Sequence, residues 1–431
     1  MPKLYIASFE VEGIRCFKAR QHIRFTNEDG KLSQWTVIVG ENGTGKTTLL
    51  QLIAGMVPIE DDLFAGRNPR LDNYTKEYVQ RFREKLHPET AKASISEVFA
   101  HSTKLGDTPK LVEGLSWVSD GKAVSSRTIR PKDPKDPIEY NLYAYGAYRR
   151  SKSNTTLKSS QDDGVESLFE RDHPLIDPVE WLLRQDYLAK SSNNPGPTRS
   201  LERVKEVLKR LLPDVEEFSF TADDQAGDID VKLRIPYGIV SFDELSDGHA
   251  TMMTWIVDFC ARQQRAFPES EDVFLESAVV LIDEFAMHMH PKWQREAIAF
   301  LSETFPNVQF IVTSHSPLIL QAAPGANIVL LERKEDHVEV RNDLDALADW
   351  RIDQLLTSDL FGLTTARPPR FEEIMSKRQA LLTKDKLTDG DWAELERLDK
   401  KLEEMVPSME SAIERNLVKR ALKIVEKQEE A

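Results

Sequence analysis

The sequence predicts an α/β fold built on a parallel β-sheet, and two observations carry this prediction. Residues 240–335 alternate helical patterns (248–266, 291–303 and 317–321) with short apolar strand patterns (277–282, 308–313 and 327–332). Near the N-terminus, the apolar segment 35–39 leads through a glycine-rich segment into the helical pattern 49–56. Strands that alternate with helices pair in parallel, because each helix returns the chain to the same edge of the sheet.

The remaining segments are assigned from the same patterns. Residues 4–25 predict two strands around a turn at Gly13, and the aromatic segment 141–148 predicts another strand. Residues 57–139 are poorly periodic and predict a mainly helical insertion, with helices over 75–86 and 91–101. Polar segments 151–164 and 190–200 predict loops around a helical lobe, in which one helix begins near Pro178 and a second covers 201–212.

The last hundred residues predict a helical C-terminal region. A helix over 392–405 begins after a capping box of Thr388 and Asp391, and a second is expected over 413–425. These helices form a hairpin on the rest of the chain or an arm that assembles subunits, and the pattern does not distinguish the two. The predicted domains are 1–56, 57–139, 140–239, 240–335 and 336–431.

Composition and charge exclude several classes of protein. The chain of 431 residues is 40% hydrophobic, which is enough for a folded core. Its longest apolar run, residues 278–282, is far shorter than the roughly 20 residues that cross a bilayer, so no membrane partner is expected. No signal peptide and only two cysteines, Cys16 and Cys260, indicate a cytoplasmic protein without disulfides. A net charge of −15 argues against general attraction to DNA.

Residues 40–47, GENGTGKT, match the phosphate-binding pattern G-x-x-x-x-G-K-S/T between a predicted strand and a predicted helix. Glycines let the main-chain N–H groups surround a phosphate, and the helix N-terminus adds a partial positive charge. Lys46 is expected on the β- and γ-phosphates of ATP and Thr47 on Mg²⁺. The predicted nucleotide-binding residues of this segment are Gly40, Asn42, Gly43, Thr44, Gly45, Lys46, Thr47 and Thr48.

Two further strands end in polar residues that fit the same chemistry. Asp283 and Glu284 follow the apolar strand 277–282, so Asp283 is predicted in the Mg²⁺ shell and Glu284 as the group that orients or deprotonates the attacking water. His315 follows the next strand, 308–313, and is predicted to bond the γ-phosphate or the water. Taken singly, an acid pair can be a helix N-cap and a histidine can be structural, but both follow predicted neighbouring strands.

Residues 245–248, LSDG, open the predicted helix 248–266. This segment resembles the signature of ABC-type ATPases, with Asp247 in place of the usual first glycine and His249 in place of glutamine. In that class, the signature of one subunit contacts the γ-phosphate held by the other subunit. The resemblance therefore implies a homodimer or a higher homo-oligomer in which Ser246 and Gly248 bind the nucleotide of a second copy.

The order of these motifs, with a long insertion after the first, resembles the SMC/RecF-like branch of ABC-type ATPases. Within it, residues 283–294, DEFAMHMHPKWQ, resemble the D-E-P-E-x-H-L-H-P-x-W-Q run of OLD-family and PtuA/AriA-type anti-phage defence ATPases. Phe285 and Ala286 replace the proline and the second acid of that run, so fast hydrolysis is not implied. The resemblance implies a P-loop ABC-type ATPase head that carries the mainly helical insertion and the helical C-terminal tail.

Three smaller features remain open in the sequence. Arg15 occupies the place of an arginine that often lies near the nucleotide in such heads, and a solvated turn residue explains it equally well. The glutamine of the Q-loop is not evident, because Gln161 lies in a polar segment well past strand 141–148. The cluster Arg149, Arg150, Lys152 and Lys158 suits either phosphate contacts or a solvated face, of which the solvated face is slightly favoured.

The leading hypothesis is an ATP-binding and hydrolysing switch that uses ATP and Mg²⁺, dimerises around ATP and regulates a separately encoded effector nuclease of the HNH or Toprim type in anti-phage defence. No nuclease motif is recognised in this chain, and the defence role follows from the resemblance alone. A RecF-like DNA-repair ATPase that binds DNA directly is the alternative, and a nucleotide-locked scaffold with little turnover is a third reading.

Overall fold

The computed structural model describes most of the chain. The described residues are 3–55, 93–102, 105, 110–119, 124–127, 141–151, 164–191, 195–212, 214–223, 228–342, 350–363, 365–384 and 388–405. They belong to two compact units, Met1–Gly362 and Leu363–Ala431, and each unit is described by itself.

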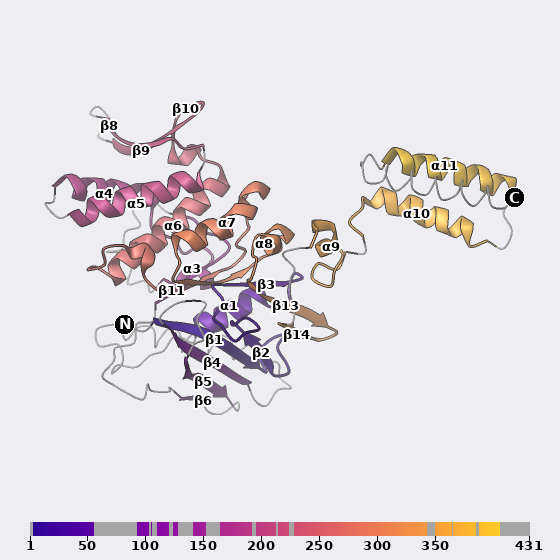
Figure 1. Cartoon of the computed structure of the whole chain (residues 1–431), viewed down its shortest axis with the longest axis horizontal. Helices are drawn as coiled ribbons and strands as arrows, with labels where there is room; N and C mark the ends of the chain where they lie inside the picture. Colours follow the sequence, from indigo (N-terminus) through magenta and orange to yellow (C-terminus); the bar gives the residue numbers. More distant parts are fainter. Residues whose placement is uncertain are drawn as a thin grey trace. The chain divides into compact units, whose positions relative to one another are not determined.

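A six-stranded sheet forms the centre of the first unit (Figure 1). Its strands, in spatial order, are β14 (His337–Arg341), β13 (Asn327–Lys334), β3 (Trp35–Gly40), β12 (Val308–Thr313), β11 (Ala278–Ile282) and β7 (Leu142–Tyr145). All neighbours pair in parallel except β13 and β14, which are antiparallel. This arrangement confirms the predicted α/β class, and β14 extends the sheet beyond residue 335, where the sequence analysis ended the head.

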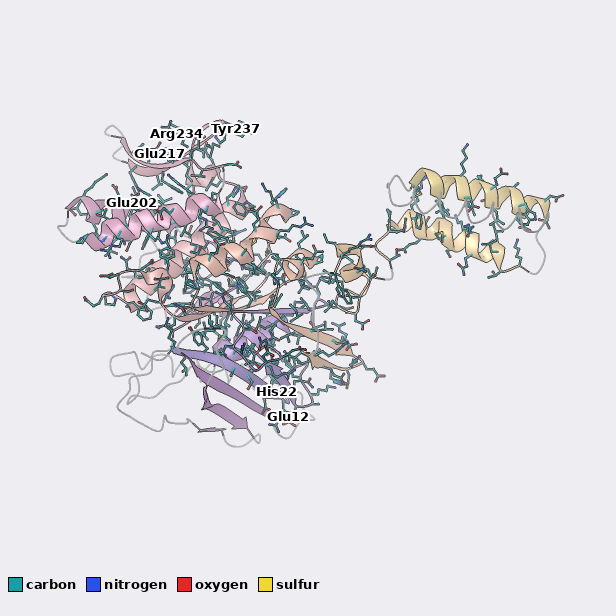
Figure 2. The ribbon with its side chains drawn as sticks, viewed as in Figure 1. Glu12, His22, Glu202, Glu217, Arg234 and Tyr237 are labelled. Carbon is teal, nitrogen blue, oxygen red and sulfur yellow. The ribbon has the colours of Figure 1, made fainter. Side chains whose placement is uncertain are left out.

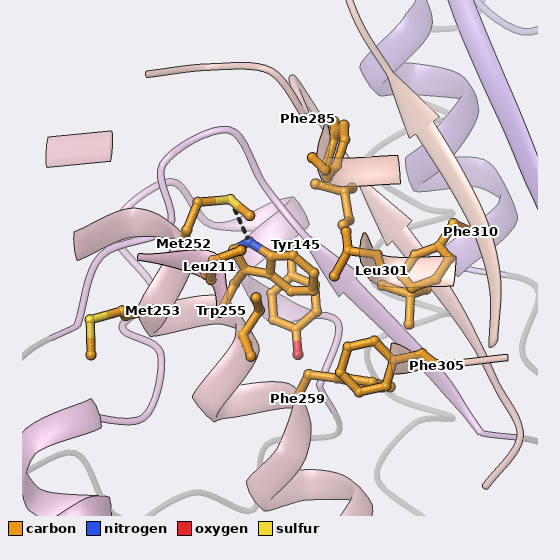
Figure 3. Packing of buried hydrophobic residues seen from close by; sticks show 14 of the residues in the cluster. Tyr145, Leu211, Met252, Met253, Trp255, Phe259, Phe285, Leu301, Phe305 and Phe310 are labelled. Atoms are coloured by element: carbon orange, nitrogen blue, oxygen red, sulfur yellow. Dashed lines mark hydrogen bonds between the residues drawn. The ribbon is translucent and has the colours of Figure 1, made fainter. Parts of the chain in front are cut away.

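Helices cover one face of this sheet. They are α4 (Pro178–Ser191), α5 (Pro195–Leu211), α6 (Asp247–Ala266), α7 (Pro291–Thr304) and α8 (Pro317–Gln321). Alternate strand residues such as Val280 and Ile282 point into this layer, where they join a core with Phe259 and Phe305 (Figure 3). Helix α6 is the central helix of this layer, since its side chains from Met252 to Gln263 are all buried.

The other face carries α1 (Lys46–Ala54) and a second, antiparallel sheet (Figure 1). The strands of that sheet, in spatial order, are β2 (Gln21–Arg24), β1 (Lys3–Glu12), β4 (Ala93–Ser102), β5 (Lys110–Ser119) and β6 (Val124–Arg127). Val279 and Leu281 point into this second core. The buried Gln309 side chain ties the two sheets together, because its amide bonds both the N–H and the C=O of Ile6 at 2.9 Å.

The predicted helix over 91–101 is wrong, because this segment forms β4 and pairs with β1 over nearly its whole length. Its isolated apolar residues fit a helical stripe and a strand equally well, and tertiary pairing with β1 decides the outcome. The described parts of the insertion 57–139 with regular structure are strands, whereas the expected helix over 75–86 lies outside the described residues.

The two predicted helices of residues 140–239 are confirmed as α4 and α5. The same segment contains the short helix α3 (Glu166–Phe169) and strands that the sequence analysis did not predict. A three-stranded antiparallel sheet consists of β8 (Glu217–Asp223), β9 (Asp228–Ile235) and β10 (Gly238–Ser241). Glu217 and Arg234 lie on its strands, and Tyr237 lies in the turn between β9 and β10 (Figure 2). Helix α5 begins at Pro195, so residues 195–200 are helical and not part of the expected loop. Two short helices, η1 (Phe242–Glu244) and η2 (Val273–Leu275), flank α6, and α9 (Ile352–Leu356) follows β14.

In the second unit, α10 (Pro369–Leu382) and α11 (Asp389–Met405) form a helical hairpin. The predicted capping box is confirmed, since Thr388 donates its N–H and hydroxyl to Asp391 at 2.9 and 2.7 Å. Leu395 and Leu398 are buried in the hairpin. The partner of α11 is therefore α10, which was not predicted, and the expected helix over 413–425 lies outside the described residues.

Among the helices that the structure describes, none combines the length and the apolar character that a membrane span needs.

Candidate nucleotide-binding site

The predicted site residues follow the carboxyl ends of neighbouring parallel strands. Residues 41–47 follow β3, residues 314–316 follow β12 and the acid pair follows β11. These three strands are adjacent in the sheet. The carboxyl edge of a parallel sheet is where loops and helix N-termini gather around a ligand. The fold therefore brings the three segments to one place, as their positions in the sequence predicted.

The phosphate loop begins α1, and its glycines adopt conformations that other residues rarely reach. Gly43 and Gly45 have φ angles of 80° and 91°, and Gly45 is the N-cap of α1. A β-carbon at Gly45 would also lie 2.6 Å from Sγ of Cys16, so the turn between β1 and β2 packs on the loop. The N-terminus of α1 thus presents its free N–H groups to this edge of the sheet.

Lys46 lies folded over the loop that contains it. Its Nζ donates to the carbonyl oxygens of Gly40 and Glu41 at 3.0 and 2.9 Å. Burial lowers the pKa of Lys46, and the nearby carboxylates of Glu284 and Asp283 offset part of this effect. The ammonium group is therefore held beside the loop by two acceptors that a triphosphate can replace.

Asp283 joins the loop to the neighbouring strand. Its Oδ2 accepts the hydroxyl of Thr47 at 2.7 Å, and its Oδ1 accepts the hydroxyl of Thr313 at 2.7 Å. Threonine hydroxyl and carboxylate oxygens are ligands that Mg²⁺ takes beside nucleotide phosphates. In the described part of the chain, no group of three or more His, Cys, Asp or Glu side chains could hold a metal by itself. The donor set therefore fits Mg²⁺ that shares its coordination with a nucleotide.

Glu284 and His315 face each other at the open side of this site. Nε2 of His315 lies 3.2 Å from Oε1 of Glu284, and both side chains are about one third exposed, at 38% and 30%. Glu284 has a φ of 50°, which is uncommon for a residue with a β-carbon, and its N–H donates to Oγ1 of Thr313 at 2.7 Å. A carboxylate and an imidazole at this distance can share and transfer a proton of a water between them.

Arg15 lies beside the first turn of α1. Its Nη1 donates to Oγ1 of Thr48 at 2.7 Å, and its φ of 50° directs it there from the turn after β1. The side chain is therefore attached to the phosphate-loop helix and is not a freely solvated turn residue.

The predicted signature residues lie at the start of α6. Ser246 is the N-cap residue, and its Oγ lies 2.9 Å from Nδ1 of His249. The ring of His249 meets the ring of Trp293 edge-on, with 4.7 Å between the ring centres. Among the described residues, the hydrogen bonds that join the loop, the acid pair and Thr313 include neither Ser246 nor Gly248. Within one chain, the signature is thus outside this hydrogen-bond network.

The sequence analysis did not predict two residues of the site, Thr313 and Arg149. Thr313 was treated only as a strand end, although its hydroxyl contacts both acids of the pair. Arg149 was placed in a basic cluster for which a solvated face was slightly favoured over phosphate contacts, but it is buried and donates to the carbonyl oxygens of Asp283 and Glu284 at 2.7 and 3.1 Å. Arg150 is exposed, whereas Lys152, Lys158 and Gln161 lie outside the described residues.

Two family models match parts of the chain. One, described as "AAA domain", matches residues 8–57, and the other, described as "AAA domain, putative AbiEii toxin, Type IV TA system", matches residues 236–321. The first range contains the phosphate loop, and the second contains the signature, the acid pair and His315.

Curated relatives match over a larger part of the chain. Septu protein PtuA of Bacillus mycoides is 24% identical over 401 residues, which are 92% of this chain and 50% of PtuA. The chain is similar to PtuA. A protein called "Retron Vc95 probable ATPase", from Vibrio cholerae, is 24% identical over 375 residues, 73% of this chain and 71% of that protein. The expected similarity to PtuA-type ATPases is confirmed, and the chain spans about half the length of this PtuA.

A solved structure described as "Crystal structure of the SmcHead bound to the C-winged helix domain of ScpA" aligns with a TM-score of 0.45 and 14% sequence identity. The alignment covers 78% of this chain and 97% of the SMC head chain.

Proposed function

We propose that this chain binds ATP with Mg²⁺ and hydrolyses it. The observation that carries the proposal is the double hydrogen bond of Asp283, which joins Thr47 of the phosphate loop to Thr313, beside the pair Glu284 and His315. Lys46 and the N-terminus of α1 bind the phosphates. When bound at Thr47 and Asp283, Mg²⁺ neutralises charge on the β- and γ-phosphates.

The hydrolytic step uses residues of the open side of the site. The Glu284 carboxylate orients the attacking water and accepts its proton, and His315 holds the carboxylate and bonds the γ-phosphate oxygen.

The test compares ATP turnover by the wild type and Glu284→Gln, with Glu296→Gln as the matched control on the exposed side of α7. We expect Glu284→Gln to retain ATP binding and lose at least about 100-fold in kcat. Equal, near-background phosphate release from all three proteins overturns the hydrolytic function and favours a nucleotide-locked scaffold.

The proposal extends to a dimer that forms around ATP. Ser246 begins a helix, so its hydroxyl and the N–H groups of α6 suit the γ-phosphate of a second copy. Analytical ultracentrifugation of Glu284→Gln tests this arrangement: ATP is expected to convert monomers into dimers. Adding Lys46→Ala or Ser246→Arg to this variant should keep the protein monomeric. A molecular mass that does not change when ATP is added contradicts the shared site. A dimer that still forms in the variant with Ser246→Arg contradicts it as well.

The biological role that we propose is regulation of a separately encoded effector nuclease, of the HNH or Toprim type, in anti-phage defence. Similarity to PtuA and to a retron ATPase supports this role. Co-expression with the product of the neighbouring reading frame should reduce phage plaques, and Lys46→Ala should abolish the reduction.

Burial of Arg149 removes a cation from the cluster that a direct DNA clamp would use. Salt-sensitive DNA binding by the isolated chain, without an effector, would favour the RecF-like alternative.

A further inference from the structure

Arg149 crosses from the segment after β7 to the turn that contains the acid pair. Its Nη1 donates to the carbonyl oxygens of Asp283 and Gly146 at 2.7 and 3.1 Å, and its Nη2 donates to the carbonyl oxygen of Glu284 at 3.1 Å. Only 2% of the residue surface is exposed. A single guanidinium group therefore holds two consecutive main-chain carbonyls of the acid turn, which its planar fork of donors allows.

Among the residues that the structure describes, this contact leaves a buried cation with no carboxylate among its hydrogen-bond partners. Within the described residues, the three partners of Arg149 are main-chain carbonyls, and its Nε is buried with no hydrogen-bond partner. Burial lowers the pKa of Arg149 to about 10, and the nearby charges of Asp283 and Glu284 oppose this shift. A buried charge that bonds only main-chain carbonyls has a large desolvation cost, so it contributes little to the stability of a fold. The contact therefore indicates a role beyond stability.

One of the carbonyls that Arg149 binds belongs to Glu284, whose main chain has an uncommon conformation. Glu284 adopts the left-handed conformation with φ 50°, and such conformations persist only when their surroundings hold them. Its N–H donates to Thr313, and its carbonyl accepts from Arg149 and from the N–H of Met287 at 3.0 Å. Main-chain contacts on both sides of Glu284 thus set the direction in which its carboxylate leaves the turn toward His315.

We propose that Arg149 is a positioning residue for ATP hydrolysis, whose guanidinium holds the Asp283 and Glu284 carbonyls so that the Glu284 carboxylate stays in line with the attacking water. This inference rests on the proposed function. Arg149 touches no reacting atom, so its removal changes the placement of Glu284 and leaves the phosphate loop intact. The effect belongs to kcat, because the loop and Lys46 supply ATP affinity.

The experiment separates kcat from ATP affinity in Arg149→Ala and Arg149→Lys. We expect kcat to fall about 100-fold in Arg149→Ala, since small misplacements of a catalytic group have effects of this size. Arg149→Lys, whose single ammonium lacks the planar fork, should lose about 10-fold, and the affinity for a fluorescent ATP analogue should change less than about threefold in both variants. Arg150→Ala, at the exposed neighbouring position, should behave like the wild type.

Chemical rescue distinguishes positioning from a general structural effect. Guanidinium chloride at millimolar concentrations should restore part of the kcat of Arg149→Ala, whereas equal sodium chloride should not. The inference is overturned if either variant keeps wild-type kcat, if ATP affinity falls in step with kcat, or if guanidinium rescues nothing in folded Arg149→Ala. If Arg149→Ala does not fold, the kcat and affinity of Arg149→Lys decide alone. A wild type without ATP turnover instead refutes the proposed function.

Discussion

The α-carbon of Gly248 packs directly on the main chain of His288, and a β-carbon at residue 248 would lie 2.3 Å from the carbonyl oxygen of His288. That carbonyl belongs to the loop between the acid pair and α7, where His288 has a φ of 65°. The contact brings the N-terminus of α6 against the loop that follows Glu284. In a single chain, Gly248 is therefore needed for close packing, independently of any phosphate that its N–H binds.

Gly248→Ala is expected to lower both stability and activity. The added methyl group cannot fit unless the main chain of α6 or of the 285–290 loop moves, and overpacking of this kind destabilises by about 1–3 kcal/mol. Because Glu284 directly precedes the displaced loop, ATP turnover should fall together with the urea midpoint. Steady-state phosphate release and urea unfolding, followed by tryptophan fluorescence, measure the two effects.

Gly390→Ala is the matched control, because Gly390 also lies in the first turn of a helix and a β-carbon at this position would meet nothing closer than Oγ1 of Thr388 at 3.8 Å. It should leave turnover unchanged and leave stability unchanged or slightly higher. Wild-type stability and turnover in Gly248→Ala would show that the two segments do not pack as described.

Thr313→Val is expected to impair ATP turnover at limiting Mg²⁺. The variant keeps the shape of Thr313 but removes the hydroxyl that bonds Asp283 and the N–H of Glu284, and this leaves a partly buried N–H without its partner. Loss of a hydrogen bond to a metal ligand commonly reduces affinity or activity about 10- to 100-fold. Turnover measured against Mg²⁺ concentration should show a higher half-saturation and a lower maximum.

Thr304→Val provides the comparison for Thr313→Val. Thr304 is also buried, but its hydroxyl bonds the carbonyl oxygen of Phe300 within α7, away from the acid pair. This control should retain the Mg²⁺ dependence of the wild type. If both threonine variants lose turnover equally, the contribution of Thr313 is general stability and not the placement of Asp283.

His249 is expected to make the fold less stable in mild acid. Burial lowers the pKa of His249 below its usual 6.5, and the charge of Asp214 offsets part of this shift. Below about pH 6.5, His249 is therefore protonated more in the unfolded chain than in the folded chain. This protonation favours the unfolded chain, so the free energy of unfolding decreases as the pH falls below about 6.5. His249→Gln should flatten the decrease of the urea midpoint between about pH 7.5 and 5.5.

His22→Gln removes an exposed imidazole on β2 and is the control for this experiment (Figure 2). Because its side chain is exposed, its removal should leave the urea midpoint at about pH 7.5 close to that of the wild type. An equal slope in the wild type and His249→Gln would show that protonation of His249 is not coupled to folding.

The sequence predicted the elements whose signals are local. The strands that carry the phosphate loop, the acid pair and His315 are short apolar runs between helical patterns, and the structure reproduces them within one or two residues. Their adjacency followed from parallel pairing, so the contact between Thr47 and Asp283 was predictable. The capping box at Thr388 was equally local.

What the sequence could not predict depends on contacts between distant segments. Strand β4 is set by pairing with β1, about 90 residues earlier, and nothing within residues 93–102 distinguishes it from an amphipathic helix. Arg149 stands beside another arginine in the sequence, and its burial comes from contacts with residues 283–284, which follow the neighbouring strand β11. A signal was nonetheless present, because an arginine directly after a buried strand lies at the same carboxyl edge as the acid pair.

A buried ion pair within α6 provides the strongest expected effect on stability. Asp258 is fully buried, and Arg262, with its side chain 6% exposed, donates through Nε to Asp258 at 2.6 Å. Asp258 also accepts the hydroxyl of Tyr145 and the N–H of Ile176, both at 3.0 Å, and so links α6 to β7 and to the helical lobe. Arg262→Met should destabilise the first unit by about 3–5 kcal/mol, because it leaves a buried carboxylate without its cation.

The double variant Asp258→Asn with Arg262→Met then tests whether charge is the reason. Once the carboxylate is neutral, loss of Arg262 no longer strands a buried charge, so the double variant should be more stable than the sum of the two single effects predicts, by about 1–3 kcal/mol. Lys190→Met breaks the exposed pair with Asp186 at the same i, i+4 spacing in α4 and should cost at most about 1 kcal/mol. Urea unfolding of the four variants measures their free energies of unfolding. If the effects of Asp258→Asn and Arg262→Met on this free energy are additive, Asp258 and Arg262 stabilise the helix independently, through packing and separate hydrogen bonds.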